Sequence, residues 1–143
     1  MRIVLGSDER GVLPSALVAF LDGSGHTVRL VGPLAGDHQE WAAVGHEVGL
    51  LVTSGVCDRG IVCCWSGTGV SIAANKVPGI RAALCSDAET ARLARRYNHA
   101  NVLALSLRTT SEAVAKEIAA AFLAEPDGTE AFDHRNVSHL ESL

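Results

Sequence analysis

The sequence predicts an α/β protein: a three-layer, Rossmann-like, doubly wound sheet of five parallel strands with helices on both faces. Short apolar runs alternate with amphipathic helical runs from one end of the chain to the other, which is the pattern of a parallel sheet covered by helices. The chain has 143 residues, a length suited to one domain spanning 1–143, and no linker or internal repeat divides it.

Each of the five expected strands is a run of apolar residues between turn-forming residues. The runs cover residues 2–7, 26–31, 60–65, 80–85 and 101–106. Apolar residues at helical spacing predict helices after the first, second and fifth runs. Their buried faces are formed by Leu13, Leu17, Phe20 and Leu21, by Val44, Val48, Leu51 and Val52, and by Val114, Ile118 and Phe122.

Local signals indicate where these three helices begin and end. Gly23 ends the first and Gly55 ends the second. Thr110 or Ser111 caps the last, which stops before Pro126.

The remaining helices follow the third and fourth strands. A glycine-rich turn opens one, and the capping-box pattern Ser86-Asp87-Ala88-Glu89 starts another, which reaches about Tyr97. Residues 134–143 are expected to add a short final helix within a tail that covers about 126–143.

Composition excludes several classes of function. The formal net charge is −4 and aromatic residues make up 4% of the chain, so broad nucleic-acid binding is not expected. The first apolar stretch is too short for a signal peptide or a membrane span, so we expect a cytoplasmic protein without membrane contact. The four cysteines form no CxxC pair, which favours buried or catalytic thiols over a zinc site.

The carboxyl ends of the first and third strands are expected to meet at a ligand crevice. In the common strand order 2-1-3-4-5, ligands bind where the first and third strands part. Asp8 follows the first strand, and Cys64 and Ser66 lie at the end of the third. Two loops that are far apart in sequence would therefore face each other across one crevice.

The turn after the third strand combines a thiol, a hydroxyl and a glycine-rich helix start. Backbone N–H groups near Gly67 and Gly69, with the positive end of the helix dipole, can hold an anion and favour a neighbouring thiolate. We therefore expect Cys64 to act as a general base beside an anion hole, an arrangement that suits an enediolate. The alternative for Cys64 is an inert buried thiol, which is what we expect of Cys63 and Cys85.

A helix cap and a dinucleotide site are the two other interpretations of this turn. The Ser66 hydroxyl also suits a helix cap. A dinucleotide site is not expected, because Ile72 stands where the third glycine of that motif belongs and the motif follows the third strand instead of the first.

Several segments resemble, in the same order, one family of sugar-phosphate enzymes. They are Gly6-Ser7-Asp8-Glu9-Arg10-Gly11, Cys64-Trp65-Ser66-Gly67-Thr68-Gly69 running into Ser71-Ile72-Ala73-Ala74-Asn75-Lys76, Val77-Pro78-Gly79-Ile80-Arg81-Ala82-Ala83, and Asn98-His99-Ala100-Asn101-Val102-Leu103-Ala104 followed by Arg108. Nearly the whole chain resembles the type B ribose-5-phosphate isomerases and the related galactose-6-phosphate isomerase subunits, with the tail the weakest part.

This resemblance implies a cofactor-independent aldose–ketose isomerase that acts on a small phosphorylated sugar through an enediolate. It assigns proton transfer to Cys64 and stabilisation of the enediolate to Ser66. It also implies that Asp8 binds substrate hydroxyls and that Arg108 binds the phosphate. The other substrate-binding residues that it implies are Glu9, Gly67, Thr68, Gly69, Val70, Ser71, Tyr97, Asn98, Arg135 and His139. The tail is expected to pack on a partner subunit of a homodimer or tetramer.

Two departures from the family pattern lie in the expected crevice. Glu9 replaces a histidine, and because a carboxylate is a poor phosphate contact we expect Glu9 to bind a hydroxyl or to face away. Trp65 stands at a position that is usually glycine, where it either narrows the pocket or turns outward.

Two further departures lie near the end of the chain. Tyr97 replaces the histidine that the family uses to open the furanose ring, and the spacing leaves open whether His99 substitutes for it. The family's tail motif has two arginines that reach a partner's phosphate, of which Arg135 is retained and the other is His139.

Two alternatives to a pentose-phosphate isomerase stay open. Tyr97 and Glu9 favour an isomerase of tetrose or erythrulose phosphate. A non-catalytic, sugar-phosphate-binding subunit would explain Glu9, Tyr97 and His139 as signs of lost activity, but the intact thiol, hydroxyl and glycine of the turn argue against it.

Overall fold

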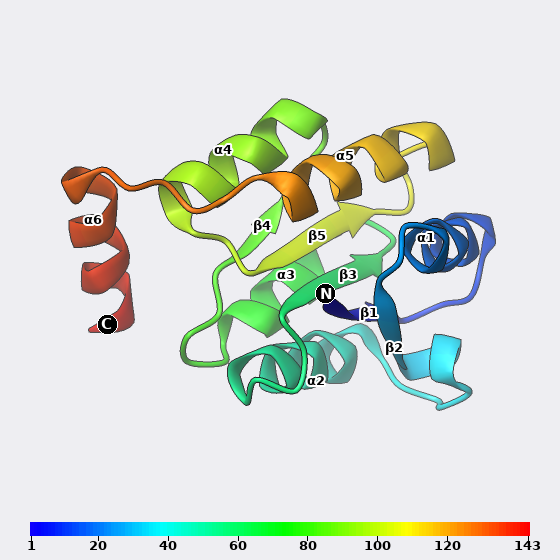
Figure 1. Ribbon diagram of the computed structural model, residues 1–143. Coiled ribbons are helices and arrows are strands. Elements are labelled where there is room, and N and C mark those ends of the chain that lie inside the picture. Colours follow the sequence, from blue (N-terminus) through cyan, green and yellow to red (C-terminus); the bar gives the residue numbers. More distant parts are fainter.

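The computed structural model describes all residues, Met1–Leu143, and has a five-stranded parallel sheet at its centre (Figure 1). All four strand pairings are parallel. The strands are β1 (Arg2–Ser7), β2 (Thr27–Val31), β3 (Arg59–Cys64), β4 (Ala82–Leu84) and β5 (Val102–Ser106).

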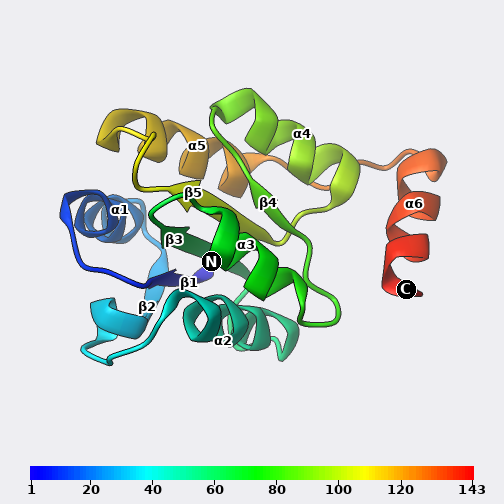
Figure 2. The ribbon, with the colours of Figure 1, turned by 180° about the vertical axis from the view of Figure 1, so that it is seen from behind.

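Helices cover both faces of this sheet, which confirms the predicted three-layer, doubly wound fold. The helices α1, α4 and α5 lie on one face and α2 and α3 on the other (Figures 1 and 2). Their bounds are α1 (Val12–Gly23), α2 (Trp41–Thr53), α3 (Thr68–Asn75), α4 (Ala88–Asn98), α5 (Glu112–Ala124) and α6 (Ala131–Glu141), with a 3-10 turn, η1 (Gly32–Ala35), after β2.

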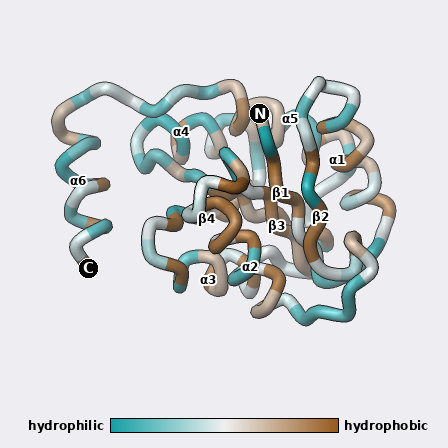
Figure 3. The backbone as a smooth tube through the Cα atoms, turned by 60° about the horizontal axis from the view of Figure 1, so that its bottom comes forward, coloured by the Kyte–Doolittle hydropathy of each residue, from teal (hydrophilic) through white to brown (hydrophobic).

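Two apolar layers form because neighbouring residues of a strand point to opposite faces. In β3, Ile61 and Cys63 pack under α1, α4 and α5, whereas Val62 and Cys64 pack under α2 and α3. Figure 3 shows the apolar segments gathered in the sheet and a largely polar α6. The alternation places the adjacent residues Cys63 and Cys64 in different layers.

The strand order is β2-β1-β3-β5-β4, so the order 2-1-3-4-5 was wrong. Every residue of β5 is buried, as suits a strand with neighbours on both sides. The strand β4 has only three residues and ends in an exposed Leu84, as suits an edge strand. The junction of β1 and β3 is unaffected by this exchange, so the expected crevice keeps its place.

Element ends agree with the sequence except at three places. Residues 80–81 lie outside β4, because the Asn101 side chain binds the Arg81 amide and the Asn75 side chain binds both backbone groups of Ala82. The helices α2 and α6 each begin about three residues before the predicted start. Asp87 and Ser111 cap α4 and α5, so Ser111 is the cap and Thr110 is not.

The tail after α5 leaves the sheet and ends in α6, which stands at one end of the molecule (Figure 1). Arg95 pairs with Asp127 at 2.7 Å, and Arg96 pairs with Glu125 at 2.7 Å. Arg81 also pairs with Glu141. These ion pairs tie the tail to α4 and to the start of β4. None of the helices has the length and apolar character needed to cross a bilayer.

Candidate active site

The carboxyl edge of the sheet brings three of the predicted site loops together. The arrowheads of β3 and β5 point to the same end of the molecule in Figure 1, away from α6. Ser7 of β1 pairs with Cys63 of β3, and Cys64 pairs with Ser106 of β5. Asp8 therefore follows β1 on one side of Cys64, and Arg108 follows β5 on the other.

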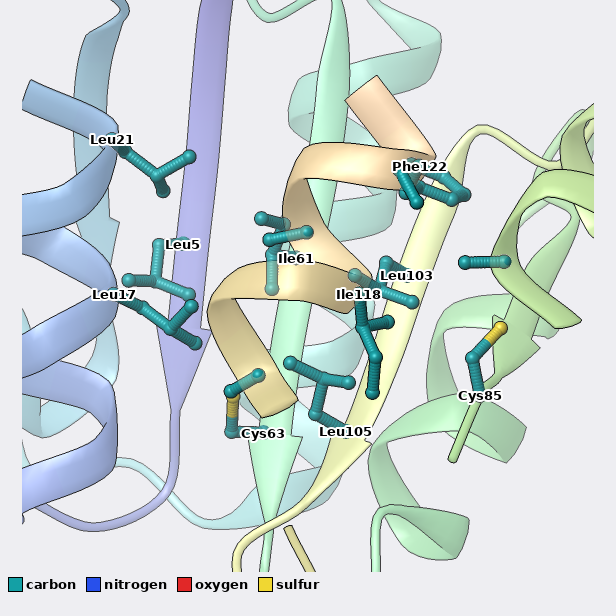
Figure 4. Close-up of a cluster of buried hydrophobic side chains, with 14 of the residues drawn as sticks. Leu5, Leu17, Leu21, Ile61, Cys63, Cys85, Leu103, Leu105, Ile118 and Phe122 are labelled. Atoms are coloured by element: carbon teal, nitrogen blue, oxygen red, sulfur yellow. The ribbon is translucent and has the colours of Figure 1, made fainter. Parts of the chain in front are cut away.

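The two cysteines of β3 have different surroundings. Cys63 is fully buried among Leu5, Leu105 and Ile118 (Figure 4), and burial raises the pKa of its thiol to about 12. The thiol of Cys85 also has its pKa raised by burial, to about 11. Cys64 is 5% exposed at the end of the strand. Of the three, only Cys64 adjoins the turn that opens α3.

This turn offers hydrogen-bond donors at the start of α3. Gly67 is the N-cap residue, with φ of 76° and no side-chain cap, so Ser66 is not the cap. The Ser66 hydroxyl lies 2.6 Å from the Thr68 hydroxyl. No protein acceptor binds the amides of Gly69 and Val70. An anion at this turn would meet free N–H groups and the positive end of α3.

Close packing around the turn requires its two glycines. A Cβ on Gly67 would lie 2.6 Å from Cδ1 of Leu84, and the positive φ adds backbone strain. A Cβ on Gly69 would lie 2.9 Å from Cε3 of Trp41. The turn is thus held between the end of β4 and the start of α2.

The backbone after Cys64 is fastened to the end of β5. The carbonyl of Trp65 accepts hydrogen bonds from the Ser106 hydroxyl and from the Arg108 amide, both at 2.9 Å. The carbonyl of Cys64 accepts one from the Leu107 amide at 3.0 Å. The Trp65 side chain is 63% exposed, so of the two predicted arrangements the structure has the outward one.

Asp8 places an unpartnered carboxylate oxygen at this edge. Its Oδ1 is buried without a hydrogen-bond partner. Burial raises the pKa of Asp8, and the charge of Glu9 raises it further. The Glu9 side chain is exposed, and its carbonyl accepts a hydrogen bond from the Ser7 hydroxyl at 2.7 Å.

A second set of predicted residues lies at the opposite edge. The helix α4 runs back from the end of β4, so it finishes at the amino edge, where α6 also lies. Five of the residues bordering a hollow of about 510 Å³ there are Tyr97, Asn98, Phe132, Asn136 and His139. Arg135 is an exposed residue of the same α6. Within one chain, the fold does not bring these residues to Cys64.

His99 belongs to this amino edge as well. It ends α4 with a φ of 48°, is 7% exposed, and donates from Nε2 to the Gly128 carbonyl at 3.1 Å. Its ring meets the His134 ring edge-on, with centroids 5.0 Å apart. His99 therefore joins the tail to α4.

Three residues absent from the sequence-based prediction border the carboxyl edge: Gln39, Trp41 and Ser106. Ser106 carries no sequence signal beyond its place at the end of a strand. Gln39 lies in a polar connection whose path is set only by the tertiary fold, and Trp41 begins the helix α2 that follows it. No cluster of three His, Cys, Asp or Glu side chains suited to a metal ion is present.

The family model for ribose/galactose isomerases matches residues 3–140. The chain belongs to this family. It is 38% identical over 123 residues to ribose-5-phosphate isomerase B of Escherichia coli, covering 85% of this chain and 83% of that protein. It is 36% identical over 125 residues to D-erythrulose-4-phosphate isomerase of Pectobacterium atrosepticum, covering 86% and 82%.

Solved structures of the ribose/galactose isomerase family share the whole fold. Ribose-5-phosphate isomerase B of Clostridium thermocellum superposes with a TM-score of 0.91 at 37% identity, covering 99% of this chain and 96% of that one. The type B enzyme of Trypanosoma brucei gives 0.90 at 37% identity, covering 99% and 97%. The predicted family membership is thereby confirmed.

Proposed function

We propose that this chain is an aldose–ketose isomerase of a small phosphorylated sugar that works through an enediolate and needs no cofactor. The observation that carries the proposal is the position of Cys64. It ends β3 between Asp8 and Arg108 and directly precedes the turn with free amides at Gly69 and Val70. Relatives that cover most of the chain are sugar-phosphate isomerases.

The first chemical step is removal of a proton from carbon. With the aldose bound in its open form, the Cys64 thiolate takes the C2 proton, and the electrons move to the carbonyl oxygen to give the enediolate. The Ser66 hydroxyl and the amides of Gly69 and Val70 stabilise the negative oxygen. Transfer of the hydroxyl proton from O2 to O1 and return of the carbon proton to C1 give the ketose, so no atoms are gained or lost.

Phosphate binding completes the site. Arg108 follows β5 on the same edge as Cys64, and a guanidinium binds phosphate in a two-pronged geometry. Arg135 and His139 can contact the same phosphate only from another chain, because α6 lies at the opposite edge.

A homodimer with shared sites, or a tetramer built from such dimers, follows as part of the proposal. Exposed apolar side chains surround the turn and α3. Others lie on the tail and at the end of α4, and a partner would cover both groups. They are Trp41, Trp65, Ile72 and Leu84 in the first group and Tyr97, Phe132, Leu140 and Leu143 in the second. A hollow of about 770 Å³ also lies at the amino edge, beside Leu140 and Leu143.

In this arrangement the tail, about 126–143, packs on the partner. Its residues enter the site next to the partner's Cys64, and Tyr97 and Asn98 at the end of α4 come with them. We place this enzyme in the cytoplasm, since all four cysteines are free and buried, as suits a reducing compartment.

Ribose 5-phosphate and a tetrose phosphate are the two candidate substrates. Tyr97 favours the tetrose phosphate, because a phenol is a poorer proton shuttle at neutral pH than an imidazole is. A tetrose 4-phosphate has no free hydroxyl with which to close a furanose, so it needs no ring-opening group. The similar identities to the two relatives leave the choice to experiment.

Exchange with deuterated water tests the proposal. Incubation of the protein with ribulose 5-phosphate and with erythrulose 4-phosphate should put deuterium at the carbon next to the carbonyl, together with formation of the aldose. A non-catalytic binding subunit would leave both sugars unlabelled.

The two substrates are separated by Tyr97→His. We expect kcat/KM to favour the tetrose phosphate in the native chain, and Tyr97→His to raise kcat/KM on ribose 5-phosphate alone. Efficient turnover of ribose 5-phosphate by the native chain, unchanged in the variant, would leave the pentose as the substrate.

A further inference from the structure

Two buried side-chain atoms lack a hydrogen-bond partner, and they are Oδ1 of Asp8 and Oε1 of Gln39. Both atoms are acceptors. Asp8 follows β1, Gln39 lies in the connection from β2 to α2, and β1 and β2 are neighbours in the sheet. A buried acceptor without a donor is costly and uncommon in folded proteins, so two of them at one edge call for a donor from outside the chain.

The orientation of the Gln39 amide is fixed by its other end. Nε2 donates to Oε2 of Glu47 at 2.8 Å. Exchanging the nitrogen and oxygen would set Oε1 against a carboxylate, where it would be repelled. Oε1 is therefore the atom that is left without a donor.

The connection that carries Gln39 adjoins the candidate active site. Trp41, two residues further on, contacts Gly69 of the turn. On the other side, the Arg10 side chain donates from Nε to the Pro33 carbonyl at 2.8 Å, which joins the loop after β1 to the loop after β2. Along the chain, Gln39 thus lies between Pro33, which is bonded to the loop after β1, and Trp41, which contacts the turn that opens α3.

We propose that Gln39 is a substrate-binding residue whose Oε1 accepts a hydrogen bond from a non-reacting hydroxyl of the sugar, beside Asp8. The inference rests on the proposed isomerase function and adds a specificity contact to it. A site with a buried acceptor distinguishes strongly against a ligand that lacks the matching hydroxyl, because the acceptor is then left unpaired. The preferred ligands are phosphorylated chains that keep a free hydroxyl between the reacting carbons and the phosphate.

Binding of two matched sugar acids tests this contact. The probes are 4-phospho-D-erythronate and 2-hydroxy-4-phosphobutanoate, which lacks only the hydroxyl at C3, with inorganic phosphate as a baseline. Titration calorimetry should show that Gln39→Leu raises the Kd of phosphoerythronate about tenfold. The Kd of the deoxy acid and that of phosphate should stay unchanged.

The control is His38→Leu, a polar-to-leucine change at an exposed side chain of the same loop. It should leave all three Kd values near those of the native chain, and thermal unfolding should show both variants folded. An equal loss of affinity for the two acids in Gln39→Leu would make the residue structural and overturn the proposal.

The isomerase function and the Gln39 contact fail in different ways. If the native chain turns over a sugar phosphate but Gln39→Leu binds phosphoerythronate as well as the native chain does, only the Gln39 contact is wrong. If the native chain neither labels a ketose phosphate nor binds phosphoerythronate more tightly than inorganic phosphate, both proposals are wrong.

Discussion

Cys63 and Cys64 show how one step along a strand changes the chemistry of a thiol. Cys63 points into the layer under α1 and α5, where burial holds its pKa at about 12 and keeps it protonated. Cys64 points to the other layer and ends the strand beside the turn. Two residues of the same type thus have different surroundings, and only Cys64 adjoins the candidate active site.

Substitution of each cysteine should separate these roles. We expect Cys64→Ala to lower kcat by roughly 10² to 10⁴ with little change in Tm, because a positioned base contributes about that much. Cys63→Ala should keep kcat within a few-fold and cost about 1 kcal/mol of stability through lost packing. Near-native turnover by Cys64→Ala would contradict its role as the base.

The raised pKa of Asp8 predicts how the stability of the protein depends on pH. Its pKa is raised in the folded state, chiefly by burial, so the ionised carboxylate lowers stability at pH values above both the folded and unfolded pKa. That penalty fades as pH falls through the folded pKa, and it is gone below the unfolded value of about 3.9. We expect Asp8→Asn to have a higher Tm than the native chain at pH 7 and the same Tm near pH 3, while kcat/KM drops by about tenfold or more.

Thermal unfolding at the two pH values and steady-state kinetics check this prediction. A lower Tm for Asp8→Asn at pH 7 would mean that the carboxylate is stabilised by contacts in the free protein. The isosteric change keeps the shape of the side chain, so packing is not altered.

Among the elements, the turn between β3 and α3 is the most constrained. Gly67→Ala should destabilise the protein by about 1–3 kcal/mol, since a positive φ and contacts with Leu84 and Leu105 both oppose a Cβ. Gly23→Ala is the matched control, because a Cβ there meets no atom within 4 Å. It should change stability by less than about 1 kcal/mol. Urea unfolding of both variants measures the difference, and equal values would contradict it.

The elements themselves could be predicted from sequence, but their lateral order could not. The spacing of apolar residues and helix caps such as Asp87 depend on local contacts, so they can be predicted from the sequence. The placement of β5 between β3 and β4 depends on which strand buries more surface. That burial follows from Val102 and Leu103 having neighbours on both sides, a property that exists only in the folded sheet.

The whole molecule divides the predicted site residues into two groups at opposite edges. The resemblance identifies Tyr97 and Arg135, but spacing alone does not show that α4 carries its end away from Cys64. Gln39 has no sequence signal, because a single glutamine in a polar loop looks like any surface residue. Its buried, unpartnered oxygen becomes visible only when the loop is packed against Glu47.

At this scale we predict complementation between two defective chains. Arg135→Ala and Cys64→Ala should each be nearly inactive alone. Mixed and allowed to exchange subunits, they should recover roughly a quarter of native activity, because half of the dimers then contain one intact site. An active monomer in sedimentation at the assay concentration would contradict the shared site, and so would a mixture that stays inactive.

In the proposed homodimer, the separation of Cys64 from Arg135 also determines how substitutions in one chain affect the sites of a mixed dimer. A chain substituted at both positions would combine its altered residue 64 with the native tail of its partner in one site. In the other site its altered tail would meet the native Cys64. Both active sites of such a mixed dimer would be inactive, whereas a chain altered at one position would inactivate only one of the two sites. A doubly altered copy of the gene would therefore act as a dominant-negative allele, and a singly altered copy would not.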